Sequence, residues 1–200
     1  MKLEARELTF YYKNRKKSPL IDRFSLTLGP GERVGLTGLS GRGKTTLCRL
    51  LAGYEKPKSG SVLLDERPVG GYRGVCPVQM IWQHPETAVD PLLPLGETLR
   101  EAGPPEEDIL HRLGIEEAWF GRYPSELSGG ELQRFCLARA LRPETKFLLC
   151  DEITAMLDLV TQAQIWEFLL GEADRRKMGM LVVSHSRALL EKVCTRVVAL

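Results

Sequence analysis

Residues 38–46 read GLSGRGKTT and combine a flexible backbone with a fixed cation and two hydroxyl groups. Four residues separate Gly38 from Gly43, and Lys44 and Thr45 follow directly, which is the spacing of a phosphate-binding loop. Glycines let successive amides turn toward an anion, the lysine reaches the β- and γ-phosphates, and the threonine hydroxyl can ligate Mg²⁺. The stretch therefore predicts a nucleotide phosphate site, and the alternative is an ordinary glycine-rich turn.

An acidic pair closes a second apolar run, FLLCDE. A buried strand would deliver Asp151 at its carboxyl end, where open parallel sheets place their ligands, with Glu152 directly after it. Asp151 suits a magnesium shell, and Glu152 suits a general base for water. Alone, the pair would simply mark a loop after a strand, but beside a phosphate loop it favours nucleotide hydrolysis.

The run LSGGELQR, residues 127–134, lies between these two elements. Ser128 can cap the helix that follows, and Gly129 and Gly130 leave its first amides open to an anion. Taken by itself, the run indicates a capped helix.

The elements that must position these residues alternate along the chain. Short apolar runs typical of strands buried on both faces occupy 33–37, 146–151, 180–185 and 196–200, and helical patterns occupy 45–52, 131–141, 160–176 and 187–193. This order predicts a largely parallel sheet covered by helices. The proline- and glycine-rich segment from residue 84 has short helical patterns and no strong strand, which indicates an inserted helical subdomain.

Composition indicates one globular domain. The 200 residues are 43% hydrophobic with a formal net charge of +2, too mild for an extended nucleic-acid surface, although the basic run at 13–17 is either a local patch or a solvated loop. No stretch has the roughly 18 apolar residues of a membrane span, and the first ten residues lack a secretory signal. Five scattered cysteines indicate reduced thiols. We expect a chain that stays in the cytosol.

The phosphate loop, LSGGELQR, FLLCDE and the later SH, in this order, resemble the nucleotide-binding domain of ATP-binding cassette (ABC) proteins over essentially the whole chain. The resemblance implies an α/β fold, a P-loop NTPase core with a mostly parallel sheet, an N-terminal antiparallel β portion and an inserted helical subdomain. It implies a single cassette domain at 1–200, with the helical subdomain at about 84–140. It also implies an ATPase with ATP and Mg²⁺ as cofactors.

The resemblance also implies a role for each matching residue. Tyr12 in LTFYY matches the aromatic adenine platform, Asp158 in TAMLD lies at a subunit contact, and His185 senses the γ-phosphate. The implied catalytic residues are Glu152, His185 and Gln83, and the implied metal ligands are Thr45, Gln83 and Asp151. The implied nucleotide contacts are Tyr12, Gly38, Ser40, Gly41, Gly43, Lys44, Thr45, Thr46, Ser128, Gly129, Gly130 and Asp158. Alone, Gln83 and His185 would be ordinary loop or core residues.

The resemblance implies assembly with other chains. A second cassette, identical or different, would face the first head to tail, so that ATP on the Lys44 loop of one is closed by Ser128 and Gly130 of the other. A membrane permease would receive the motion through the Gln83 loop, and a substrate-binding protein would act indirectly. We therefore expect a peripheral protein on the cytoplasmic face of the cell membrane. The segment QHPETAVDPLLPLGETLREA is similar to importers of peptides and nickel.

The sequence departs from the family pattern at several points. Ile153 replaces a usual proline, Arg42 replaces a usual serine or cysteine, and RVVAL ends where the family usually continues, which predicts a sheet short of an edge strand. Two alternatives remain open: a soluble ABC ATPase acting on nucleic acid or ribosomes, and a regulatory cassette without turnover. The presence of Glu152 and His185 argues against the second, and we expect no nucleic-acid partner.

Overall fold

The computed structural model describes residues 1–12, 18–101, 103–104 and 106–200, so the basic run at 13–17 lies outside the described residues. The strands are β1 (Leu3–Phe10), β2 (Ile21–Leu28), β3 (Arg33–Thr37), β4 (Ser59–Leu64), β5 (Arg67–Pro68), β6 (Val78–Ile81), β7 (Phe147–Asp151), β8 (Gly179–Val183) and β9 (Arg196–Ala199). The helices are α1 (Lys44–Leu51), α2 (Leu95–Glu101), α3 (Glu107–Arg112), α4 (Gly129–Ala140), α5 (Leu159–Arg176) and α6 (Arg187–Val193). Short 3₁₀ helices occupy Val69–Gly71, Pro85–Thr87, Glu117–Trp119 and Pro124–Glu126.

The central sheet is parallel and has the strand order β6-β7-β8-β3-β9. Every residue of β7 and β8 is buried, because helices or the other sheet cover both faces. Neighbouring residues of β7 face opposite cores: Leu149 packs with α1, and Leu148 packs with α5. The four strands and four helices expected from the apolar pattern lie within two residues of their expected ends.

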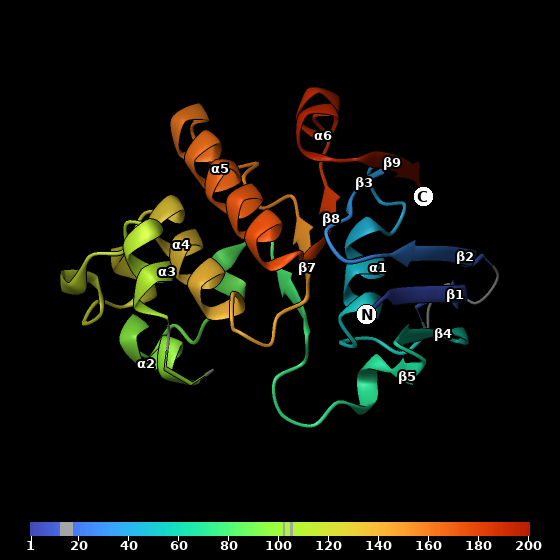
Figure 1. Cartoon of the computed structure of the whole chain (residues 1–200), viewed down its shortest axis with the longest axis horizontal. Helices are drawn as coiled ribbons and strands as arrows, with labels where there is room; N and C mark the ends of the chain where they lie inside the picture. The colour runs from blue at the N-terminus through green and yellow to red at the C-terminus, as the bar shows by residue number, and fades with distance from the viewer. Residues whose placement is uncertain (13–17, 102, 105) are drawn as a thin grey trace.

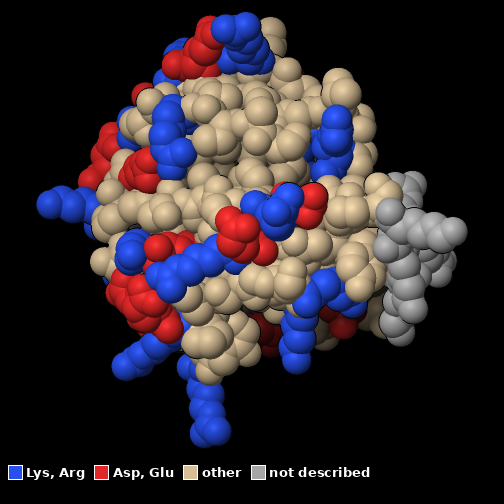
Figure 2. All heavy atoms as spheres, turned by 90° about the vertical axis from the view of Figure 1, so that its right-hand side faces the viewer, with Lys and Arg blue, Asp and Glu red and all other residues tan. Residues whose placement is uncertain are grey.

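A second, antiparallel sheet has the order β2-β1-β4-β5 and lies on the right in Figure 1. Its inward residues, among them Leu8, Ile21 and Leu64, share one apolar core with Leu47 of α1 and Leu36 of β3. Figure 2 shows Lys, Arg, Asp and Glu side chains mixed over this side of the molecule. The helix that follows the phosphate loop is thus held between two sheets.

Helices α2, α3 and α4 lie between β6 and β7 in the chain and gather on the opposite side of the molecule, with no strand among the described residues of that segment (Figure 1). Their apolar faces, including Leu99, Ile109 and Phe135, join the core formed by α5 and the parallel sheet. The predicted fold class is confirmed: a mostly parallel sheet, an N-terminal antiparallel β portion and a helical insertion.

Candidate nucleotide-binding and catalytic site

The phosphate loop joins β3 to α1, and its last glycine has no room for a side chain. Gly43 has φ +100°, and a Cβ there would lie 2.9 Å from Leu20 Cγ. The next residue, Lys44, is buried, and its Nζ donates to the carbonyls of Gly38 at 2.9 Å and Leu39 at 3.3 Å. The loop therefore curls around its own cation, which is held at the start of α1.

A cavity of about 310 Å³ lies over this loop. Its lining residues are Leu20, Ser40, Gly41, Gly43, Lys44, Thr45, Thr46, Gln83, Glu152 and His185. All but the first of these are predicted site residues, although they come from four separate segments. They meet because β3, β6, β7 and β8 are parallel neighbours whose carboxyl ends open at one edge of the sheet.

Asp151, the last residue of β7, is 1% exposed. Burial raises the pKa of its carboxyl group, which a hydrogen bond with Thr45 partly opposes. Its Oδ1 has no hydrogen-bond partner among the described residues. A buried carboxylate oxygen without a donor, next to a threonine hydroxyl, is suited to a cation.

Glu152 is held by two neighbours on adjoining strand ends. Its Oε1 lies 3.0 Å from His185 Nε2, and its Oε2 accepts a hydrogen bond from Gln83 Nε2 at 3.5 Å. Its backbone is left-handed, with φ +51°, and its amide donates to the Val183 carbonyl. A left-handed conformation is strained for glutamate, so the end of β7 is constrained to direct this side chain into the cavity.

Tyr12 lies beside this cavity and does not line it. Its hydroxyl and Thr46 Oγ1 are 3.2 Å apart, and its ring packs edge-on against Phe10. Tyr12 instead lines a groove with Phe10, Tyr11 and Lys58. The Tyr12 side chain therefore adjoins the phosphate loop and is 41% exposed.

Ser128, Gly129, Gly130 and Asp158 also lie outside the cavity lining. Ser128 caps α4: its hydroxyl accepts from the Glu131 amide, and its own amide donates to the Glu131 carboxylate at 2.7 Å. Hydrogen bonds from Ser128 lower the pKa of Glu131. A Cβ on Gly130 would lie 3.2 Å from Thr161 Cγ2, whereas one on Gly129 would meet nothing within 4 Å. Within one chain, these residues form a capped helix start that adjoins α5.

Asp158 caps α5 in the same way. Its side chain accepts from the amides of Val160 and Thr161 and from the Thr161 hydroxyl at 2.6 Å. The Thr161 hydrogen bonds lower the pKa of Asp158. The family resemblance implied a subunit contact for Asp158 and no capping role.

Leu20 lines the cavity and belongs to no motif. Its amide donates to the Phe10 carbonyl at 2.8 Å, at the end of the segment that joins β1 to β2. The tertiary contact with Gly43 places it there, and no local pattern in the sequence signals that contact.

The fold and the site together define a P-loop nucleotide hydrolase: a phosphate loop after β3, a buried carboxylate at the end of β7, which is two strands away in the same sheet, and a glutamate directed at the same cavity. A family model described as ABC transporter matches residues 21–155, more than half of the chain. The chain belongs to the ABC transporter family, as its ATP-hydrolysing cassette. The family and the enzyme class inferred from the motifs are thereby confirmed.

Two curated relatives illustrate the range of similarity. The nickel import ATP-binding protein NikE of Rhodospirillum rubrum is 36% identical over 201 residues, which cover 90% of this chain and 72% of that protein. The methionine import ATP-binding protein MetN of Caulobacter vibrioides is 34% identical over 197 residues, covering 91% of this chain and 59% of that protein.

Among solved structures, the dimeric ABC transporter cassette MJ0796 matches with a TM-score of 0.85 at 23% identity, over 99% of this chain and 94% of that one. A dimeric post-hydrolysis state of the same cassette, bound to ADP and Pi, has a TM-score of 0.84 at 24% identity, with the same coverage. These matches support the fold. None of the helices in the described part of the chain has the length and apolar character needed to cross a membrane.

Proposed function

We propose that the chain is the ATP-hydrolysing subunit of an importer and that it drives uptake of nickel complexes or peptides through a partner permease. The observation that carries the proposal is the convergence of Lys44, Gln83, Glu152 and His185 on one cavity. The similarity to NikE favours nickel, and the nearly equal similarity to MetN makes a methionine-type cargo the first competitor.

Each side chain in the cavity has a separable task in hydrolysis. Lys44 neutralises charge on the β- and γ-phosphates of ATP. Hydrogen bonds to the loop carbonyls already hold its ammonium group at the phosphate loop. Glu152 accepts the proton of the attacking water, and Gln83 and His185 orient that carboxylate from either side. Hydrolysis needs mainly positioning and charge neutralisation, which fixed groups supply at little reorganisation cost.

Thr45, Asp151 and Gln83 are the residues that would hold Mg²⁺. No cluster of three or more His, Cys, Asp or Glu side chains suited to a metal occurs in the described residues. Mg²⁺ usually takes only one or two protein carboxylates and completes its shell with phosphates and water, which the unpartnered Asp151 Oδ1 fits. When bound with ATP, the ion neutralises phosphate charge.

A second cassette would complete the site. Ser128, Gly129 and Gly130 start a helix and do not line the cavity over their own chain's phosphate loop. Exposed apolar side chains near this helix start, Leu159 at 81% and Val160 at 67%, support a buried contact there. A head-to-tail dimer would place the Ser128 helix of one copy on ATP at the Lys44 loop of the other.

A hollow beside the Gln83 loop is suited to a permease segment. It has a volume of about 470 Å³ and is lined by Trp82 and Met80 of the β6 segment, Cys136 and Arg139 of α4, and other residues including Cys76 and Glu101. Trp82 is the residue before Gln83, so pressure from a partner in this hollow would reach the group that contacts Glu152.

The central experiment compares Glu152→Gln with the wild type. Removing the base should leave ATP binding intact and lower turnover by about 100- to 10,000-fold. Glu144→Gln, at an exposed carboxylate that lines neither the cavity nor the Tyr12 groove, is the matched control and should hydrolyse normally. Undiminished hydrolysis in Glu152→Gln would contradict the assignment.

The transport assignment is tested by reconstitution with a permease and its loaded binding protein, using nickel, a peptide and methionine as cargo. Stimulated turnover with nickel or peptide supports the proposal, and stimulation by methionine alone refutes the cargo. Gln83→Ala should reduce the stimulation more than it reduces ATP binding, whereas Gln162→Ala should reduce neither. Copurification only with nucleic acid or ribosomes, with no permease raising turnover, would favour the soluble cassette.

A further inference from the structure

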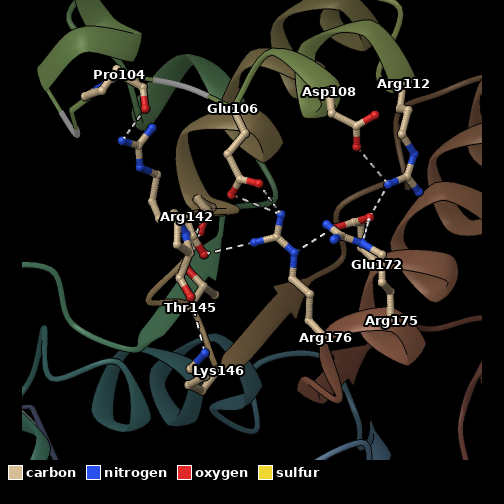
Figure 3. Close-up of polar contacts among 12 residues, drawn as sticks. Pro104, Glu106, Asp108, Arg112, Arg142, Thr145, Lys146, Glu172, Arg175 and Arg176 are labelled. Carbon is tan, nitrogen blue, oxygen red and sulfur yellow. Dashed lines mark hydrogen bonds and ion pairs between the residues drawn. The ribbon is translucent and has the colours of Figure 1, made fainter.

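A buried carboxylate on α5 binds three arginines at once (Figure 3). The Glu172 side chain is 0% exposed. Its Oε1 accepts hydrogen bonds from Arg112 and from Arg175 Nε, the latter at 3.0 Å. Its Oε2 accepts from Arg175 Nη2 at 2.8 Å and from Arg176 Nε at 2.7 Å. Four charge-assisted hydrogen bonds on one carboxylate make a rigid junction.

The charge state of this junction is fixed near neutral pH. Burial raises the pKa of Glu172, but hydrogen bonds from Arg175, Arg112 and Arg176 outweigh burial and lower the pKa to about 2. The carboxylate is therefore ionised, which three guanidinium groups require of their common partner.

The junction joins separate parts of the fold. Arg112 is the last residue of α3, in the helical insertion, whereas α5 packs on the parallel sheet. Arg176 Nη2 also lies 3.1 Å from both carboxylate oxygens of Glu106, the residue before α3. The α5 helix therefore binds both ends of α3 through ion pairs.

The next contact leads from α3 to the helix that begins at Ser128. The carbonyl of Leu113, directly after α3, accepts from Arg134 Nη1 of α4 at 2.5 Å, and Arg134 Nη2 donates to Gln164 of α5 at 2.8 Å. Arg134 is in the first half of α4. A displacement of α3 would therefore remove one of the two hydrogen-bonded supports of this arginine.

We propose that Glu172 is a positioning residue that holds α3 against α5 and, through Leu113 and Arg134, sets the orientation of the Ser128 end of α4. One consequence of this proposal rests on the proposed function: the orientation of α4 governs closure of the ATP site shared between two cassettes. A cluster that only stabilises the fold would leave closure unchanged.

The sharpest variant is Arg112→Gln, because it detaches α3 and leaves Glu172 with two arginines in place. The Arg112 side chain is 33% exposed, so the variant should fold. Amide hydrogen exchange in α3 and in the first turns of α4, measured without nucleotide, should accelerate about tenfold, the loss expected for one charged hydrogen bond. Arg112→Lys, which keeps the charge, should recover part of the protection.

Asp174→Asn is the matched control on the same helix. Asp174 lies two residues after Glu172 and forms an ion pair with Arg33 of β3 at 2.5 Å. Removing this carboxylate therefore weakens a contact between α5 and the sheet and leaves the contacts of α3 in place. Exchange in α3 and the start of α4 should stay at the wild-type rate in this variant. Unchanged exchange in Arg112→Gln, or equal acceleration in Asp174→Asn, overturns the proposal.

A second measurement tests the consequence for closure. In a Glu152→Gln background with ATP and Mg²⁺, Arg112→Gln should raise the dimer dissociation constant about tenfold at unchanged ATP affinity, by the same hydrogen-bond loss. Faster exchange with an unchanged dimer constant overturns the positioning role. If the Glu152→Gln parent itself stays monomeric with ATP, the shared site of the proposed function fails, and the exchange data alone decide whether Glu172 holds α3 and α4.

Discussion

Replacing Gly43 with alanine should lower the free energy of unfolding through two separable effects. The first is backbone strain, because φ is +100° and a left-handed residue with a Cβ costs about 1 to 2 kcal/mol. The second is crowding: the new Cβ would lie 2.9 Å from Leu20 Cγ and 3.3 Å from Leu20 Cδ2. Overpacking of this kind costs about 1 to 3 kcal/mol. We expect a total loss of about 2 to 5 kcal/mol in the free energy of unfolding.

Gly41 supplies the matched control. It has φ +76°, and a Cβ there would meet nothing within 4 Å, so Gly41→Ala should show the strain term alone. Urea denaturation should place Gly43→Ala about 1 to 3 kcal/mol below Gly41→Ala. When Leu20→Ala is combined with Gly43→Ala, the smaller side chain should relieve the crowding. The double variant should therefore lose less free energy of unfolding than the sum of the losses in the two single variants. Equal losses in the two glycine variants, or strict additivity with Leu20→Ala, would refute the reasoning.

Three further outcomes are expected. Lys44→Ala should weaken ATP binding about 10- to 100-fold by calorimetry, since a charged donor to the phosphates is lost; equal affinity would argue against the phosphate-loop role. Asp151→Asn should abolish the Mg²⁺-dependent gain in ATP affinity without lowering the metal-free free energy of unfolding, because burial already disfavours this carboxylate; a retained Mg²⁺ effect would exclude Asp151 as a ligand. The pKa of Glu172 is lowered from 4.5 to about 2. Its stabilisation, about 3 kcal/mol at most, should be complete above pH 4.5 and lost as pH falls toward 2, and this slope in acid urea titrations should vanish in Glu172→Gln.

Much of the parallel core was predictable from local pattern. The central residues of the runs at 33–37 and 146–151, namely 34–36 and 147–150, are apolar or glycine because both faces of those strands are buried there, and such runs have few other structural solutions. The phosphate loop and the acidic pair could be located because their chemistry fixes residue types at short spacing. Gln83 and His185 could be assigned to the same site as Glu152 only through the family resemblance, since contacts across 69 and 33 residues leave no local signal in the sequence.

The remaining features depend on tertiary contacts. Leu20 lines the cavity only because Gly43 lies against it, and Asp158 could be assigned as a cap only once the start of α5 was known. Glu172 occurs in the sequence as one acidic residue on an amphipathic helix. Its partner Arg112 lies 60 residues away, so the pair could not be inferred from spacing.

The order of the strands in the sheet also constrains how the chain reaches this state. The strand β3, which leads into the phosphate loop, is flanked by β8 and β9, both made more than 140 residues later. A chain emerging from the ribosome therefore carries the loop sequence long before the neighbours of β3 exist, and these long loops must close before any parallel pairing of β3 is gained. Exposed apolar strands in such an intermediate promote aggregation. Nucleotide can bind a formed loop only after β8 and β9 are synthesised, which makes formation of this site a late event in the folding of the cassette.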